Sequence, residues 1–96
     1  MGRLLLPALV ALLLAGPARA ADAPPGASSC TGCHAASRVP DSTIPRIAGR
    51  SAADIAKALR EYRSGAWTSS IMGRIAKGFD DQQIDALAAW FSSQPE

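Results

Sequence analysis

The sequence predicts an all-α domain, and three observations support this fold class. Ile55, Leu59 and Tyr62 recur at the i, i+4 and i+7 spacing of one helix face. A second apolar stripe with helical spacing lies between residues 84 and 91. No segment alternates apolar and polar residues as a half-buried strand does. We therefore expect helices to make up all of the regular structure.

The first 20 residues have the layout of a secretory signal peptide. A basic start, Met1-Gly2-Arg3, precedes an apolar run from Leu4 to Ala15 and a set of small residues that ends at Ala20. The run is shorter than the roughly 20 residues that a membrane-spanning helix needs. We therefore expect residues 1–20 to be removed on export to the periplasm, which leaves residues 21–96 as a single domain without a membrane span.

The charge of the expected mature chain is balanced. The full sequence has ten Lys and Arg residues and eight Asp and Glu residues, and Arg3 and Arg19 leave with the signal peptide, so eight of each sign remain. The basic residues are dispersed and form no strongly basic face, so a nucleic-acid partner is not expected. A domain of this size often needs a metal, a disulfide or a partner to supplement its small core.

The helix with Ile55, Leu59 and Tyr62 can be delimited by its capping residues. Ser51 is a good N-cap, with Asp54 three residues on, and Gly65 is suited to end the helix. Pro40 and Pro45 discourage a helix before it, so residues 41–50 are expected to form a loop.

The last helix should begin after Asp80, because Gln83 can complete a capping box with it. Phe79 and Ile84 occupy the positions of a hydrophobic staple around that cap. The intervening residues 66–78 contain two glycines, which argue against one uninterrupted helix.

The segment Cys30-Thr31-Gly32-Cys33-His34 holds both cysteines and the only histidine. A thioredoxin-type redox pair would need a βαβ context, a structural zinc site needs about four ligands, and a disulfide over so short a loop would stabilise little. In c-type haem attachment the two thiols form thioethers with the haem and the imidazole binds its iron. Export, the helical pattern and the ligand count favour one covalent haem c at Cys30 and Cys33, with His34 as an iron ligand.

Met72 is the candidate for the second axial ligand of the iron. It is the only methionine of the expected mature chain, which has no second histidine. A lone methionine is more often a core filler, but Met72 lies in the irregular segment 69–74, which can cross the open face of a haem. A histidine and a methionine as axial ligands are typical of electron-transfer haems.

With CTGCH, Pro45-Arg46-Ile47-Ala48-Gly49 and Met72 before a final amphipathic helix, the chain resembles the class I cytochromes c over nearly its whole mature length. The resemblance implies a small fold whose helices wrap around one covalently attached haem. It also implies that the carbonyl of Pro45 accepts a hydrogen bond from His34 Nδ1. Without it, Pro45 is equally well a loop stiffener.

One departure from the class I pattern lies before the first cysteine. The family usually has a helix there, and often a large side chain four residues before the cysteine, where this chain has Gly26. With so few residues available, this helix should be very short or missing.

Apolar residues that could form the haem wall, or an ordinary core, are Ile47, Leu59, Trp67, Ile71 and Phe91. Trp67 is alternatively a hydrogen-bond donor to a haem propionate. Basic residues that could surround an exposed haem edge and steer a partner are Arg46, Arg50, Arg63, Arg74 and Lys77.

A narrower likeness covers Tyr62-Arg63-Ser64-Gly65 and Met72-Gly73-Arg74-Ile75-Ala76-Lys77-Gly78. This stretch is similar to the cytochrome subunit of flavocytochrome c sulfide dehydrogenase. The resemblance implies a periplasmic one-electron acceptor for a flavoprotein dehydrogenase, which is not an enzyme by itself. The alternatives are a free diffusible mono-haem carrier that serves other periplasmic redox enzymes and, more remotely, a thiol or metal protein without haem.

Overall fold

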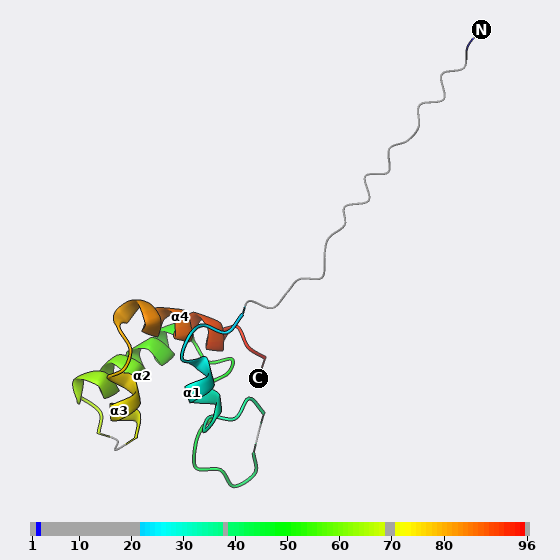
Figure 1. Ribbon diagram of the computed structural model, residues 1–96. Coiled ribbons are helices and arrows are strands. Elements are labelled where there is room, and N and C mark those ends of the chain that lie inside the picture. The colour runs from blue at the N-terminus through cyan, green and yellow to red at the C-terminus, as the bar shows by residue number, and fades with distance from the viewer. Residues whose placement is uncertain (1, 3–21, 38, 69–70, 96) are drawn as a thin grey trace.

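The computed structural model describes residues 2, 22–37, 39–68 and 71–95. Every regular element in these residues is an α-helix (Figure 1): α1 (Ala27–Thr31), α2 (Ala52–Ser64), α3 (Met72–Ala76) and α4 (Asp81–Ser92). The predicted all-α fold class is confirmed. The predicted signal peptide, apart from Gly2, lies outside the described residues, and among the described helices none has the length and apolar character needed to cross a membrane.

Helices α2 and α4 pack against each other and form the frame of the domain (Figure 1). Ser51 Oγ accepts a hydrogen bond of 3.2 Å from Asp54 N, and Gly65 ends α2 in the left-handed conformation with φ of 85°. At the start of α4, Asp80 accepts from Gln83 N at 2.8 Å and Asp80 N donates to the Gln83 side chain at 2.9 Å. The predicted starts of both helices and the end of α2 are confirmed.

The core of the domain is built mainly from the facing sides of α2 and α4. Its largest fully buried side chains are Ile84 and Leu87 of α4. Full burial of such a side chain contributes about 1.5–3 kcal/mol, so the shared core fixes α4 against α2. The buried cluster consists of Ala27, Cys30, Ile55, Ala56, Leu59, Ala76, Ile84, Leu87, Ala88 and Phe91.

Ion pairs on the polar side join the same two helices. Arg63 Nη2 lies 2.6 Å from Asp81 Oδ1, and Arg60 contacts Asp81 at 3.2 Å and Asp85 at 2.8 Å. Arg63 also donates to the carbonyl of Phe79 at 3.2 Å. Isolated exposed pairs contribute little, but here two arginines share one carboxylate. The group ties the end of α2 to the start of α4.

Helix α3 differs from the irregular structure predicted around Met72, because Met72 begins a helix of five residues that includes Gly73. Ala76 is fully buried, and α3 packs against α2. At Gly73 the first carbon of a side chain would be in ordinary van der Waals contact, 3.8 Å from the carbonyl oxygen of Tyr62 in α2. The packing of α3 on α2 outweighs the low helix propensity of this glycine.

Helix α1 has five residues and contains the first cysteine, so only three helical residues precede Cys30, in line with the very short helix that was expected there. It begins after Gly26, whose φ is 94°, and it buries Ala27 and Cys30. Turns follow the helix. The carbonyl of Cys30 accepts hydrogen bonds from the backbone N–H groups of Cys33 (3.2 Å) and His34 (2.7 Å). The two cysteines and the histidine are thereby brought into one compact unit.

Candidate haem site

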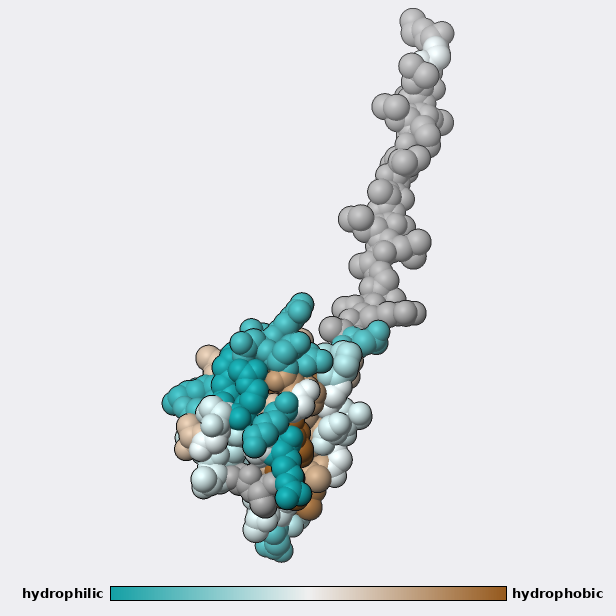
Figure 2. All heavy atoms as spheres, turned by 60° about the vertical axis from the view of Figure 1, so that its left-hand side comes forward, coloured by the Kyte–Doolittle hydropathy of each residue, from teal (hydrophilic) through white to brown (hydrophobic). Residues whose placement is uncertain are grey.

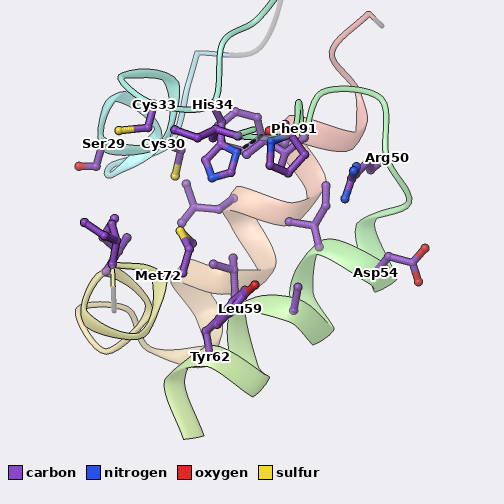
Figure 3. A pocket seen from close by; sticks show the side chains of 18 of the residues that line it. Ser29, Cys30, Cys33, His34, Arg50, Asp54, Leu59, Tyr62, Met72 and Phe91 are labelled. Atoms are coloured by element: carbon purple, nitrogen blue, oxygen red, sulfur yellow. Dashed lines mark hydrogen bonds between the residues drawn. The ribbon is translucent and has the colours of Figure 1, made fainter. Parts of the chain in front are cut away.

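A largely apolar cavity of about 430 Å³ lies between α2, α3, the C-terminal half of α4 and the segment around α1 (Figure 3). Cofactor sites commonly have volumes of roughly 300–1,000 Å³. Every residue that the sequence analysis assigned to the cofactor lines this one cavity: Cys30, Cys33, His34, Pro45, Ile47, Leu59, Trp67, Ile71, Met72 and Phe91. They come from distant parts of the chain, so the fold itself assembles the site.

The imidazole of His34 is fixed by Pro45. His34 Nδ1 lies 2.5 Å from the carbonyl oxygen of Pro45 (dashed in Figure 3). Because a carbonyl only accepts hydrogen bonds, Nδ1 must be the donor, and in the neutral ring Nε2 keeps its lone pair. This is the tautomer that a metal-ligating histidine uses when its other nitrogen is held by a carbonyl. The contact that the class I resemblance implies for Pro45 is present.

Met72 enters the cavity from α3, whereas His34 enters from the chain after α1 (Figure 3). In the figure the methionine sulfur points into the space that the imidazole also faces. A thioether sulfur and a neutral imidazole nitrogen are the two axial ligands of many cytochrome haems. The donor set around the cavity therefore fits a covalently attached haem.

The two cysteines lie at the same cavity but differ in exposure. Cys30 is buried, Cys33 is exposed, and they form no disulfide with each other. Burial raises the pKa of the Cys30 thiol, which disfavours the thiolate that redox chemistry and metal binding require. Within the described residues no three His, Cys, Asp or Glu side chains are grouped as a metal would need. The group of ligands that a structural zinc site needs is therefore absent among the described residues.

The remaining predicted wall residues divide into buried and peripheral ones. Leu59 and Phe91 are buried, whereas Trp67 and Ile71 are 45% and 63% exposed. The Trp67 ring stands edge-on to Tyr62, with ring centroids 5.5 Å apart, and its backbone N–H donates to the carbonyl of Glu61 at 3.1 Å. These contacts hold Trp67 at the margin of the cavity.

Sequence reasoning missed almost half of the lining. Beside Arg50, which it considered for the haem edge, the cavity is also lined by Ser29, Thr43, Ile44, Asp54, Ile55, Ala58, Tyr62, Ile75 and Leu87. Helical periodicity gives a signal for Ile55 and Tyr62, since they share the face of Leu59. No comparable signal exists for Ser29 or Thr43, because their place depends on how the loops close around the cavity.

The basic residues considered for partner docking have different surroundings. Arg50 lines the cavity, and Arg74 and Lys77 are exposed on and just after α3. Arg46 is half-buried, with a buried Nε that has no hydrogen-bond partner among the described residues. Arg63 is engaged in the ion pairs between α2 and α4. Figure 2 shows hydrophilic residues over the upper part of the domain, with hydrophobic residues exposed between and beside them.

Comparison with known proteins identifies a family for most of the chain. Residues 25–95 match the family described as cytochrome c. The chain is 40% identical over 65 residues to the cytochrome subunit of sulfide dehydrogenase of Chlorobaculum tepidum. The matched region covers 68% of this chain and 59% of that protein. The chain is also 40% identical over 86 residues to the thiosulfate dehydrogenase electron acceptor of Thiomonas intermedia, which covers 88% of this chain and 40% of that one.

A third relative is cytochrome c4 of Pseudomonas aeruginosa, 33% identical over 99 residues, with 98% of this chain and 49% of that protein covered. The chain thus spans between 40% and 59% of the length of these three relatives. The range matched to the family contains the CxxCH segment, Pro45 and Met72, which meet at the cavity. The chain therefore belongs to the cytochrome c family, with the all-α class I fold and a covalently bound haem c as its cofactor.

Proposed function

We propose that this protein carries single electrons through one haem c and does not itself catalyse the oxidation of a substrate. The observation that carries the proposal is the cavity that His34 and Met72 enter from different segments, beside Cys30 and Cys33. With an imidazole and a thioether as axial ligands, no iron position is left open for a substrate. When bound, the haem supplies one-electron oxidation and reduction at its iron.

Each group at the cavity has a task in this proposal. Cys30 and Cys33 hold the haem through thioethers, while His34 Nε2 and the Met72 sulfur bind its iron. Pro45 keeps the imidazole in one tautomer and orientation through the 2.5 Å contact. Residues that keep water from the haem and so help to set its potential are Ile47, Leu59, Trp67, Ile71 and Phe91.

We propose a periplasmic location for the protein, with residues 1–20 removed and residues 21–96 as the mature cytochrome domain. The support is the basic, apolar and small-residue layout of the first 20 residues. This location also suits thioether formation outside the cytoplasm.

The electron donor in our proposal is the flavoprotein subunit of a sulfide dehydrogenase. The support is the likeness of residues 62–78 to that cytochrome family and the relative named as a cytochrome subunit of sulfide dehydrogenase. The relative named as a thiosulfate dehydrogenase electron acceptor supports a second candidate donor that also oxidises a reduced sulfur compound. A free diffusible mono-haem carrier, without a dedicated donor, is the alternative.

Absorption spectroscopy and mass spectrometry of the exported protein test haem attachment and ligation. We expect the mass of residues 21–96 plus one haem, and a haem that resists extraction with acid acetone. Met72→Ala should abolish the weak red methionine–iron band and lower the reduction potential by more than about 59 mV, which is a tenfold change for a one-electron couple. The neighbouring Ile71→Ala should keep the band. An extractable haem, or an unchanged band in Met72→Ala, would contradict the proposal.

The partner is tested by mixing the oxidised holoprotein with each dehydrogenase and following haem reduction by stopped flow. Saturable reduction by the sulfide dehydrogenase flavoprotein is expected, and its rate should fall as salt is added if exposed cations steer the encounter. Arg74→Glu with Lys77→Glu should slow it, whereas Lys57→Glu, which is on α2 and does not line the cavity, should not. Equal rates with unrelated oxidases and dehydrogenases would favour the free carrier.

A further inference from the structure

Helix α1 carries Cys30 but has little support from other helices. It has five residues, and a helix so short is not stable alone. Among the described residues, the extensive helix contacts are those of α2 with α4 and of α2 with α3. The position of α1 therefore depends on individual contacts.

The ring of Phe79 occupies the space beside Gly26, the residue directly before α1. A Cβ atom on Gly26 would stand 2.5 Å from Cε1 and 2.9 Å from Cζ of Phe79. A side chain at residue 26 and the ring thus exclude each other. Gly26 also has φ of 94°, which other residues rarely adopt. The ring thus fills, from a distant part of the sequence, space that a side chain at residue 26 would enter.

Phe79 is held by the frame, so its ring can act as a fixed support. Its backbone N–H donates to Ala76 at the end of α3 (3.2 Å), and its carbonyl accepts from Arg63 of α2 (3.2 Å). Its side chain packs against the buried cluster. On the other side of the contact, the carbonyl of Gly26 lies 3.7 Å from the Cys30 sulfur. One ring therefore connects the frame with the first haem-binding cysteine.

We infer that Phe79 is a positioning residue for the haem site, which sets α1 relative to α3. Because Phe79 closely follows α3, the same contact links the side of the cavity that carries Cys30 and His34 with the side that carries Met72. The bond between Met72 and the iron should then depend on the ring. This inference rests on the axial ligation proposed above.

Phe79→Ala in the exported holoprotein tests the inference, with the methionine–iron band followed as the pH is raised. Without the ring α1 can shift, and the bond between Met72 and the iron should be lost at a lower pH. The pH midpoint at which the band disappears should fall by about one unit or more, which corresponds to a tenfold change in the ligation equilibrium. Phe79→Leu keeps much of the apolar volume and should stay near the wild-type midpoint. Ile84→Ala is the matched control, because Ile84 is fully buried in α4 and does not line the cavity.

A double-mutant cycle tests the contact itself. Gly26→Ala in the wild-type background adds both a clash with the ring and backbone strain, whereas in the Phe79→Ala background only the strain remains. The shift of the midpoint caused by Gly26→Ala should therefore be smaller in the second background. If Phe79→Ala yields no holoprotein, Phe79→Val takes its place in both experiments.

Additive shifts in the cycle, or an equal fall of the midpoint in Ile84→Ala and Phe79→Ala, would overturn the role of Phe79 and leave the haem assignment intact. A wild-type protein without the methionine–iron band would instead overturn the ligation by Met72, and the inference with it.

Discussion

The frame of α2 and α4 and the wall of the cavity are stabilised in different ways. The frame helices have 13 and 12 residues, defined caps and shared ion pairs. On the cavity side, α1 and α3 have five residues each, and the loop before α2 is tied down by single bonds, such as that of 3.0 Å from Gly49 N to the carbonyl of Phe91. The frame helices are defined by their own caps and a shared core, whereas the wall is built from short elements that meet around the cavity.

Removal of the haem should have the largest effect on the frame and the wall. In Cys30→Ala with Cys33→Ala no thioether can form, and the apolar lining would lose the group that covers it. A domain this small has little other buried surface, so most of the helical circular dichroism and the cooperative thermal transition should be lost. Circular dichroism during heating measures both. A haem-free variant that unfolds cooperatively near the wild-type Tm would show that the frame needs no cofactor.

Leu59→Ala and Ile84→Ala distinguish the wall from the frame, because both remove a buried aliphatic side chain but only Leu59 belongs to the wall. Each should lower the free energy of unfolding by about 2–5 kcal/mol, measured by denaturant titration of the holoprotein. Leu59 lines the cavity and Ile84 does not. Only Leu59→Ala should therefore also change the haem absorption spectrum and the reduction potential. Equal spectral changes in both variants would mean that frame and wall are not separable.

The sequence predicted the frame and the chemistry of the site better than the packing between them. Capping at Ser51 and Asp80 depends on residues three apart, and the two thiols and His34 form one contiguous motif, so local rules were sufficient. The contact of Phe79 with Gly26 joins distant residues and follows no periodicity. The prediction of irregular structure at Met72 was wrong because its helical conformation depends on the packing of α3 on α2. Local sequence rules do not reveal such a contact between separate helices.

Loss of the α4 cap should have a smaller effect, confined to the frame. Asp80→Ala removes the acceptor for Gln83 N and should cost about 0.5–2 kcal/mol of stability. The methionine–iron band should be unchanged under native conditions, because Asp80 does not line the cavity. Thermal unfolding gives the stability change, and Asp80→Asn, which retains a capping oxygen, is the matched control. A loss of the band would indicate that the start of α4 also supports the site.

The smallest expected effect concerns Asp81, whose exposed carboxylate joins α4 to α2. Hydrogen bonds from Arg63 and Arg60 lower the pKa of this carboxyl below its ordinary value of 3.8. A carboxyl with a lowered pKa in the folded state adds stability that is fully present above the ordinary pKa and is lost as the pH falls through the lower folded value.

The stability difference between wild type and Asp81→Asn should therefore be constant near neutral pH and shrink in acid, and salt should reduce it. Asp22→Asn removes the same charge at a residue without an ion pair among the described residues, so it is the control for the loss of one negative charge. A difference for Asp81→Asn that persists unchanged below the folded pKa would mean that the side chain acts through packing rather than charge.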